Sequence, residues 1–286
     1  MGTLYIIGNG FDLHFQLKTG VSDFKDYLKK YVTFDGWNAL DTFDSYGVGW
    51  GEYEDSLADL ELDELAELIV SPNYMSDHES DRDGGIVEME LRVESLRHCI
   101  WSALEDMVNN ANNDLCLIPK QPPFAMPGDA ILSFNYTDTI EALFDHLSLI
   151  PMLHIHGNYI NQDDLIFGYC DGKKYGETFF AQNIDEYDYY IEEQKKRLVD
   201  FYNQLKKNKQ TDLLLNFLSN ISANKVVVLG HSMSNVDAEY MELIDRIIIP
   251  REWNISVYNN DPTDSQLKKY SFYNRIKKIN ITDIVN

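Results

Sequence analysis

The segment Leu4-Tyr5-Ile6-Ile7-Gly8-Asn9-Gly10-Phe11-Asp12, close to the start of the chain, decides the predicted fold. A short apolar run ends at Gly8-Asn9-Gly10, and a segment compatible with a helix follows it. This pattern is typical of a buried parallel strand that leads into a nucleotide-binding turn. Glycines permit positive φ angles and let a phosphate approach backbone amides at a helix N-terminus. Because Gly-x-Gly after a strand is often only a tight turn, other segments must decide whether it binds a nucleotide.

Similar apolar runs recur along the chain, and they end in glycine, asparagine or histidine. The predicted strands are Thr3–Ile7, Ala130–Ser133, Met152–Ile155, Leu165–Gly168, Val226–Leu229 and Asn254–Tyr258. Asn135 follows the second of them, His156 the third, and Gly230-His231-Ser232 the fifth. Short runs with helices between them predict an α/β fold with a doubly wound, mostly parallel Rossmann-like sheet. Ligands of such sheets lie beyond the carboxyl ends of the strands, so we expect the polar strand ends to converge on one crevice.

The stretches between the predicted strands indicate helical insertions into one domain that spans 1–286. We expect an acidic helical insertion at 35–128 and a second one at 170–222. Helices are expected over Leu91–Val108, Ile184–Lys209, Val236–Ile249 and Asp261–Arg275. Pro72–Gly85 is polar and rich in glycine, serine and aspartate, so it is predicted to be a loop.

The overall composition restricts the class of protein. The formal net charge is −23, and Asp35–Glu90 holds 17 acidic residues against one basic residue, Arg82. Such a surface repels a phosphate backbone, so direct nucleic-acid binding is disfavoured. We expect no membrane span and no secretory signal, since no apolar run approaches ~18 residues. Three scattered cysteines indicate free thiols in a reducing cytoplasm.

Two residues at predicted strand ends have side chains suited to chemistry. His156 lies at a predicted turn, two residues after His154. The simplest interpretation is that His154 is a packed core residue and that His156 is an active-site base. Two histidines at this spacing can bind a metal, but no third ligand at a familiar spacing accompanies them, so no metal is implied. Asn135 does not titrate, but it can orient a water or a ribose hydroxyl, or serve simply as a turn residue.

Several acidic residues have both a functional and a structural interpretation. Asp12 and Asp138 are each placed to complement a helix dipole in its first turn. Asp237 begins a predicted helix or binds a ribose diol, and Glu54 is one acid among many. The chain lacks a phosphate-binding loop of the Gly-x-x-x-x-Gly-Lys type and a Gly-x-Ser-x-Gly elbow. Leu13 stands where the dehydrogenase fingerprint has its third glycine, which disfavours hydride transfer.

Taken together, these segments resemble the AbiH family of bacterial abortive-infection proteins, which act against phages. The matching segments occur in the expected order: Leu4–His14, Trp50–Glu54, Ser133–Thr139, His154–Gly157 and Val228–Asp237. The AbiH family in turn looks distantly similar to the sirtuin-like NAD-binding fold. That resemblance implies NAD, as substrate or ligand, held by Gly8, Asn9, Gly10, Phe11, Asp12, Gly230, His231, Ser232 and Asp237.

The same resemblance implies catalytic roles for Asn135, His156 and Asp138. Asn135 would match the asparagine of the sirtuin-like Thr-x-Asn-x-Asp motif, and His156 would match the histidine that precedes glycine. Two departures stand out. Asp138 lies three residues after the asparagine rather than two, and the Cys-x-x-Cys zinc module of deacetylating sirtuins is missing. The resemblance therefore implies NAD cleavage rather than deacetylation.

We therefore expect an anti-phage protein that hydrolyses NAD to nicotinamide and ADP-ribose. His156 would accept a proton with a pKa near neutrality. One alternative is a non-catalytic sensor of NAD or ADP-ribose. The other is an interaction module whose acidic segment Asp35–Glu90 docks a basic phage or host protein. Nuclease action is disfavoured, since no acidic spacing demands a metal cluster. A phage or host protein trigger and a homo-oligomer are both compatible with the sequence.

Overall fold

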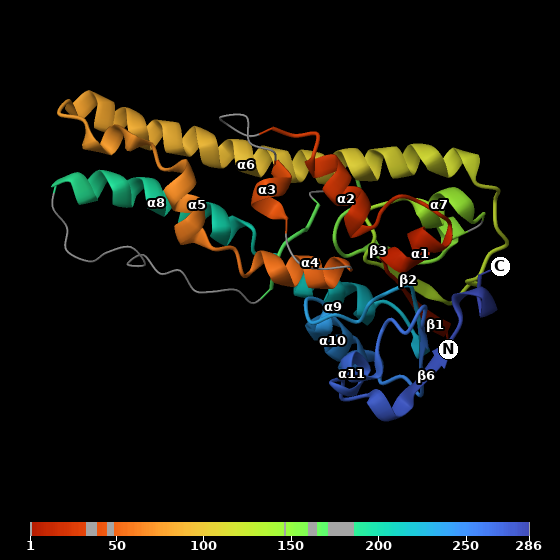
Figure 1. Cartoon of the computed structure of the whole chain (residues 1–286). Coiled ribbons are helices and arrows are strands. Elements are labelled where there is room, and N and C mark those ends of the chain that lie inside the picture. The colour runs from red at the N-terminus through yellow and green to blue at the C-terminus, as the bar shows by residue number, and fades with distance from the viewer. Residues whose placement is uncertain are drawn as a thin grey trace.

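The computed structural model describes residues 2–32, 39–44, 49–145, 147–159, 165–170 and 186–285, with the side chains of residues 41, 63, 148 and 186–188 excepted. Within these residues six strands form one sheet, in the order β3-β2-β1-β4-β5-β6 (Figure 1). The strands are β1 (Gly2–Ile7), β2 (Ala130–Ser133), β3 (Met152–His154), β4 (Ala223–Leu229), β5 (Trp253–Ser256) and β6 (Ile276–Ile279). Every pairing is parallel, and Ile6 of β1 lies opposite Leu132 of β2 and Val228 of β4. This is the strand order of dinucleotide-binding Rossmann folds, so the predicted doubly wound α/β fold is confirmed.

Alternate residues of the central strands enter two different cores, one on each face of the sheet. On β1, Leu4 and Ile6 pack with α9 (Thr211–Ser219) and α10 (Ala238–Ile248). Tyr5 and Ile7 pack on the other face with α1 (Asn9–His14) and α7 (Thr139–Leu143). Because both faces of the sheet are covered, the central strands are continuous apolar runs, as the sequence showed.

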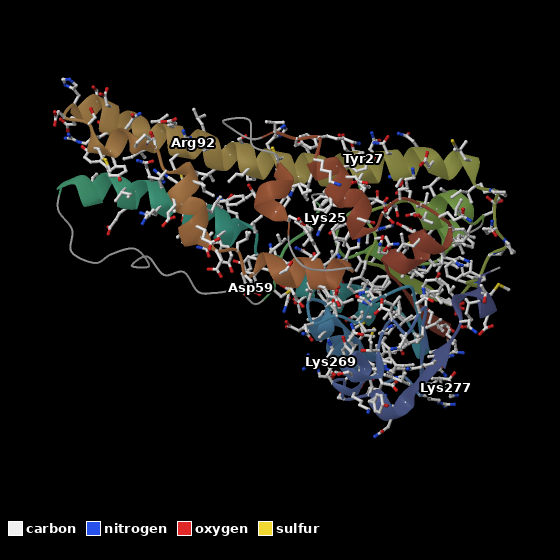
Figure 2. The ribbon with its side chains drawn as sticks, viewed as in Figure 1. Lys25, Tyr27, Asp59, Arg92, Lys269 and Lys277 are labelled. Atoms are coloured by element: carbon white, nitrogen blue, oxygen red, sulfur yellow. The ribbon has the colours of Figure 1, made fainter. Side chains whose placement is uncertain are left out.

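A third core lies outside the sheet and is built from helices, most of which lie within the predicted ranges 35–128 and 170–222. These helices are α2 (Val21–Leu28), α3 (Ala39–Phe43), α4 (Trp50–Leu57), α5 (Leu62–Ile69), α6 (Glu79–Asp114) and α8 (Glu186–Gln204). Figure 1 shows α6 and α8 side by side in an arm that projects from the sheet. Arg92 of α6, labelled in Figure 2, donates to the backbone oxygen of Ile69 at 2.5 Å and pairs with Glu88 at 2.7 Å. The bond to Ile69 ties the arm to α5. None of the described helices is long and apolar enough to cross a membrane.

The structure corrects three predicted elements and adds one strand that was not predicted. Leu165–Gly168 is not a strand, because Gly168 adopts a φ of +137° and its amide turns to the carboxylate of Glu54. Pro72–Gly85 is not a loop: a short 3-10 helix covers Pro72–Met75, and α6 begins at Glu79. The segment Asp261–Arg275 forms only α11 (Asp264–Lys268) and one 3-10 turn. Strand β6 was missed, because its two central lysines at the sheet edge interrupt the apolar pattern.

Candidate functional site

The ends of β1 and β4 meet at the point where the strand order reverses direction. Here the amide of Gly10 donates to the backbone oxygen of Gly230 at 2.7 Å. Gly230 has a φ of +67°, and a Cβ atom built on it would lie 2.1 Å from the amide nitrogen of Phe11. A Cβ at Gly8 would lie 2.6 Å from the Cα of His231. The glycines of both turns are therefore required for the two turns to pack against each other.

This packing changes the role expected for the Gly8-Asn9-Gly10 turn. The amides of Gly8 and Gly10 donate to Leu229 and Gly230, and that of Phe11 donates to Gly8. These three N–H groups already donate hydrogen bonds within the protein, whereas the sequence suggested amides that could donate to a phosphate. The ring of Phe11 is fully buried among Phe15, Phe124 and Phe144, so its side chain belongs to the core.

A cavity of about 730 Å³ opens beside these two turns. Its size falls in the range of roughly 300–1,000 Å³ that is usual for small-molecule sites. Its position matches the switch point where doubly wound sheets bind their ligands. The predicted residues that line it are Gly8, Asn9, Gly10, Asp12, Asn135, His156, Gly230, His231, Ser232 and Asp237. The structure thus gathers ten of the twelve predicted residues on one wall, and the other two are Phe11 and Asp138.

One polar set on the cavity wall is built around Asp12. Asn135 donates through Nδ2 to Oδ1 of Asp12 at 3.0 Å, and the hydroxyl of Thr137 donates to Oδ2 at 2.6 Å. An ionised carboxylate only accepts hydrogen bonds, so it fixes which end of the Asn135 amide faces it. The other end, Oδ1 of Asn135, is buried and has no hydrogen-bond partner among the described residues.

The second polar set is a buried ionic cluster around Lys207. Its Nζ lies 3.2 Å from both carboxylate oxygens of Glu54 and 3.3 Å from Oδ1 of Asp237. Asp237 also contacts two histidines: Nε2 of His156 is 3.4 Å from Oδ1, and Nε2 of His231 is 3.4 Å from Oδ2. Because Nδ1 of His231 accepts from the amide of Met233 at 2.9 Å, its ring hydrogen lies on Nε2 and faces Asp237.

Asn135 and His156 line the same cavity, but each belongs to a different one of these two sets. The ring of Phe134 packs against both histidines, with ring centroids 5.0 Å from His156 and 4.6 Å from His231. The ring of Tyr136 also lies near His156, at 6.2 Å. His156 is thus flanked by the neighbours of Asn135 rather than hydrogen-bonded to Asn135 itself.

Burial dominates the protonation of the groups on the cavity wall. It raises the pKa of Asp12 to about 6, although hydrogen bonds from Thr137 and Asn135 act against it. It also raises the pKa of Glu54 to about 7, against the attraction of Lys207. For His156, burial and Lys207 together lower the pKa to about 4. The expectation of a near-neutral pKa for His156 is therefore wrong, and the pKa of Asp12 is the closer of the two to neutral pH.

Opposite charges outweigh burial for the two central members of the ionic cluster. Burial alone would raise the pKa of Asp237, but Lys207 and the two histidines hold it well below its usual value. Burial would lower the pKa of Lys207, yet Asp237 and Glu54 raise it above its usual value. Both groups are consequently charged at neutral pH.

Asp138 is the predicted catalytic residue that lies outside the cavity lining. It precedes α7, its amide donates to Oδ1 of Asn112 at 3.0 Å, and its carboxylate accepts from Nδ2 of Asn158. Sequence reasoning missed Lys207, which resembles the other lysines of a solvated segment. Glu54 was named but not selected, although its segment Trp50–Glu54 carried part of the family resemblance.

The family model for bacteriophage abortive infection AbiH matches residues 4–258 of this chain. No curated protein and no solved structure matches it. The matched region contains both glycine turns, Asn135, His156 and the whole ionic cluster, and it covers most of the chain. The chain therefore belongs to the AbiH family of bacteriophage abortive-infection proteins.

Proposed function

We propose that this AbiH protein acts in phage defence by binding NAD at the β1–β4 switch point and hydrolysing it to nicotinamide and ADP-ribose. The observation that carries this proposal is the fixed amide of Asn135 on the wall of the cavity. Its Oδ1 is buried and lacks a partner among the described residues, so a ribose hydroxyl or a water that reaches it would satisfy an acceptor left without a hydrogen bond. A buried acceptor of this kind favours a ligand that carries hydroxyl groups.

The reaction needs little acid catalysis. The bond between C1′ of the ribose and the nicotinamide nitrogen breaks, and its electron pair neutralises the departing pyridinium ring. The ribose passes through an oxocarbenium-like state, as in the hydrolysis of sugars. Water then adds its oxygen to C1′ and gives up a proton. The site must therefore position one water, stabilise a cation and accept one proton.

Two groups on the cavity wall can accept that proton. His156 is neutral at pH 7, but its lowered pKa of about 4 makes it a weak base. Asp12 is ionised at pH 7 and its pKa of about 6 lies near the working pH, where a general base is most effective. We assign proton acceptance chiefly to Asp12, with Asn135 orienting the water and His156 providing a neutral acceptor beside the ribose.

Incubation of the purified protein with NAD, followed by chromatography, tests the proposal. The expected result is release of nicotinamide and ADP-ribose in equal amounts, with loss of at least about a hundredfold in Asn135→Ala and Asp12→Asn, as for other positioned acid–base groups. Glu90→Gln on the exposed face of α6 is a control and should keep wild-type activity. Equal activity in the wild type and both cavity variants would refute the assignment.

A second candidate, a non-catalytic sensor of NAD or ADP-ribose, is favoured by one observation. His156 is deeply buried and its pKa is lowered to about 4, which suits a neutral hydrogen-bonding wall better than a base. Saturable binding of NAD in calorimetry, with no nicotinamide released over many hours, would favour this role over hydrolysis.

A further inference from the structure

The cavity wall is acidic. The described lining residues include the carboxylates of Asp12, Glu54, Asp237 and Asp261, and among them there is no lysine or arginine. Lys207 lies behind the wall against Glu54 and Asp237, and it offsets one negative charge. Among the described residues, Lys207 pairs with Glu54 and Asp237 and not with Asp12 or Asp261, so the wall remains net negative at neutral pH.

This wall is a poor receptor for phosphate groups. At the Gly8-Asn9-Gly10 turn, the amides of Gly8 and Gly10 donate within the protein, and the amide of Phe11 just after the turn does so too. Recognition of a pyrophosphate needs free amides or cationic side chains. The described lining supplies no cationic lysine or arginine, and the negative wall repels an anion.

The wall also carries aromatic rings. Trp50, Phe134, Tyr136 and Tyr258 all contribute to the lining. Aromatic faces next to carboxylates attract planar cations, because the ring quadrupole and the negative charge act in the same direction. Together with the unsatisfied Oδ1 of Asn135, this lining suits a cationic ring attached to a sugar with free hydroxyls.

We propose that the cavity recognises its substrate through the pyridinium riboside end, and that the adenylate half contributes little to binding. The inference rests on the proposed NAD hydrolysis and names the part of the substrate that the cavity selects. It extends the substrate class to pyridinium ribosides that lack the pyrophosphate, such as nicotinamide riboside.

Calorimetric titration of the full chain with four probes tests this selection. NAD and NADH differ in the charge of the ring, so we expect NAD to bind roughly tenfold tighter, as expected of a cation near aromatic rings. Nicotinamide riboside should displace NAD, whereas ADP should not. Displacement by ADP together with no binding of nicotinamide riboside would overturn the inference.

A pair of charge variants tests whether the preference for NAD over NADH arises at the cavity wall. Asp261→Asn removes a carboxylate that lines the cavity, and Glu90→Gln removes one on the arm, away from the cavity. We expect Asp261→Asn to weaken NAD binding about threefold to tenfold relative to NADH, and Glu90→Gln to leave the ratio unchanged, because exposed distant charges are screened. Equal effects of the two variants would attribute the preference to the overall charge of the protein and overturn the inference.

The outcomes also separate this inference from the proposed function. Hydrolysis of NAD without binding of nicotinamide riboside would leave the function standing and refute the pyridinium selection. Binding of nicotinamide riboside without release of nicotinamide from NAD would support the selection and refute hydrolysis.

Discussion

Asn135 and Asp12, 123 residues apart, are joined by a hydrogen bond of 3.0 Å from Nδ2 to Oδ1 across the ends of β2 and β1. Both side chains are more than nine-tenths buried. The bond fixes the orientation of the Asn135 amide, and the carboxylate that fixes it has a pKa of about 6. The protonation of Asp12 therefore controls both a proton acceptor and the group that orients the water, which makes the site sensitive to pH.

The first prediction concerns the pH dependence of NAD turnover. We expect kcat/KM to rise as pH increases through about 6, because Asp12 must be ionised to accept a proton and to hold Asn135. Initial rates between pH 4.5 and 8.5 measure this. A rise centred near pH 4 instead would assign the base role to His156, and Asp12→Asn should abolish the step near pH 6 but not one near pH 4.

The second prediction concerns stability. The folded-state pKa of Asp12, about 6, exceeds its unfolded value near 4, so the folded state binds the proton more tightly. Asp12 therefore adds stability as pH falls from about 6 to about 4, by up to about 3 kcal/mol. Asp12→Asn should be more destabilising at pH 4 than at pH 7. Urea denaturation at both pH values checks this, and a constant difference would contradict it.

The third prediction concerns the contact between the two glycine turns. Gly230→Ala should destabilise the protein by at least about 2 kcal/mol, because φ is +67° and the new methyl group would clash with the backbone of Phe11. Gly84→Ala within α6 is the matched control, since a Cβ there meets nothing within 4 Å. It should stabilise the protein by about 0.5–1 kcal/mol. Thermal unfolding of both variants gives the comparison.

The fourth prediction concerns the buried cation. Lys207→Met should cost about 3–5 kcal/mol, because Glu54 and Asp237 lose the charge that compensates them. The pKa of His156 should rise in this variant, since Lys207 lowers it and Asp237 then acts unopposed. NMR titration of the histidines measures that shift. Adding Glu54→Gln should recover part of the lost stability, and no recovery would argue against charge compensation.

The fifth prediction concerns Asp138, whose carboxylate binds Asn158 outside the cavity lining. Asp138→Ala should change NAD turnover by less than about threefold while lowering the free energy of unfolding by about 1 kcal/mol, the usual net contribution of one hydrogen bond. Steady-state kinetics and urea denaturation separate the two effects. A loss comparable with that of Asn135→Ala would restore Asp138 as a catalytic residue.

Most of the sheet could be predicted because its central strands are buried on both faces and are therefore apolar throughout. Strand β6 could not, since at the sheet edge its Lys277 pairs with Glu252 in solvent and interrupts the apolar pattern (Figure 2). Leu165–Gly168 has the composition of a strand but packs beside the helical core, where Gly168 turns its amide to Glu54. Composition indicates burial, but it does not indicate which layer buries a segment.

The sequence by itself determined the apolar runs of the central strands and the polar residues that follow each run. It could do so because a buried strand must be apolar, and polar side chains can follow only where the chain leaves the core. Only the tertiary structure decided that the glycines serve turn-to-turn packing and that Asn135 and His156 belong to separate polar sets. It also brought Lys207 from the second predicted insertion against Glu54 from the first. Charge pairs and pKa values depend on distances between residues far apart in the chain, and those distances exist only once the layers have packed.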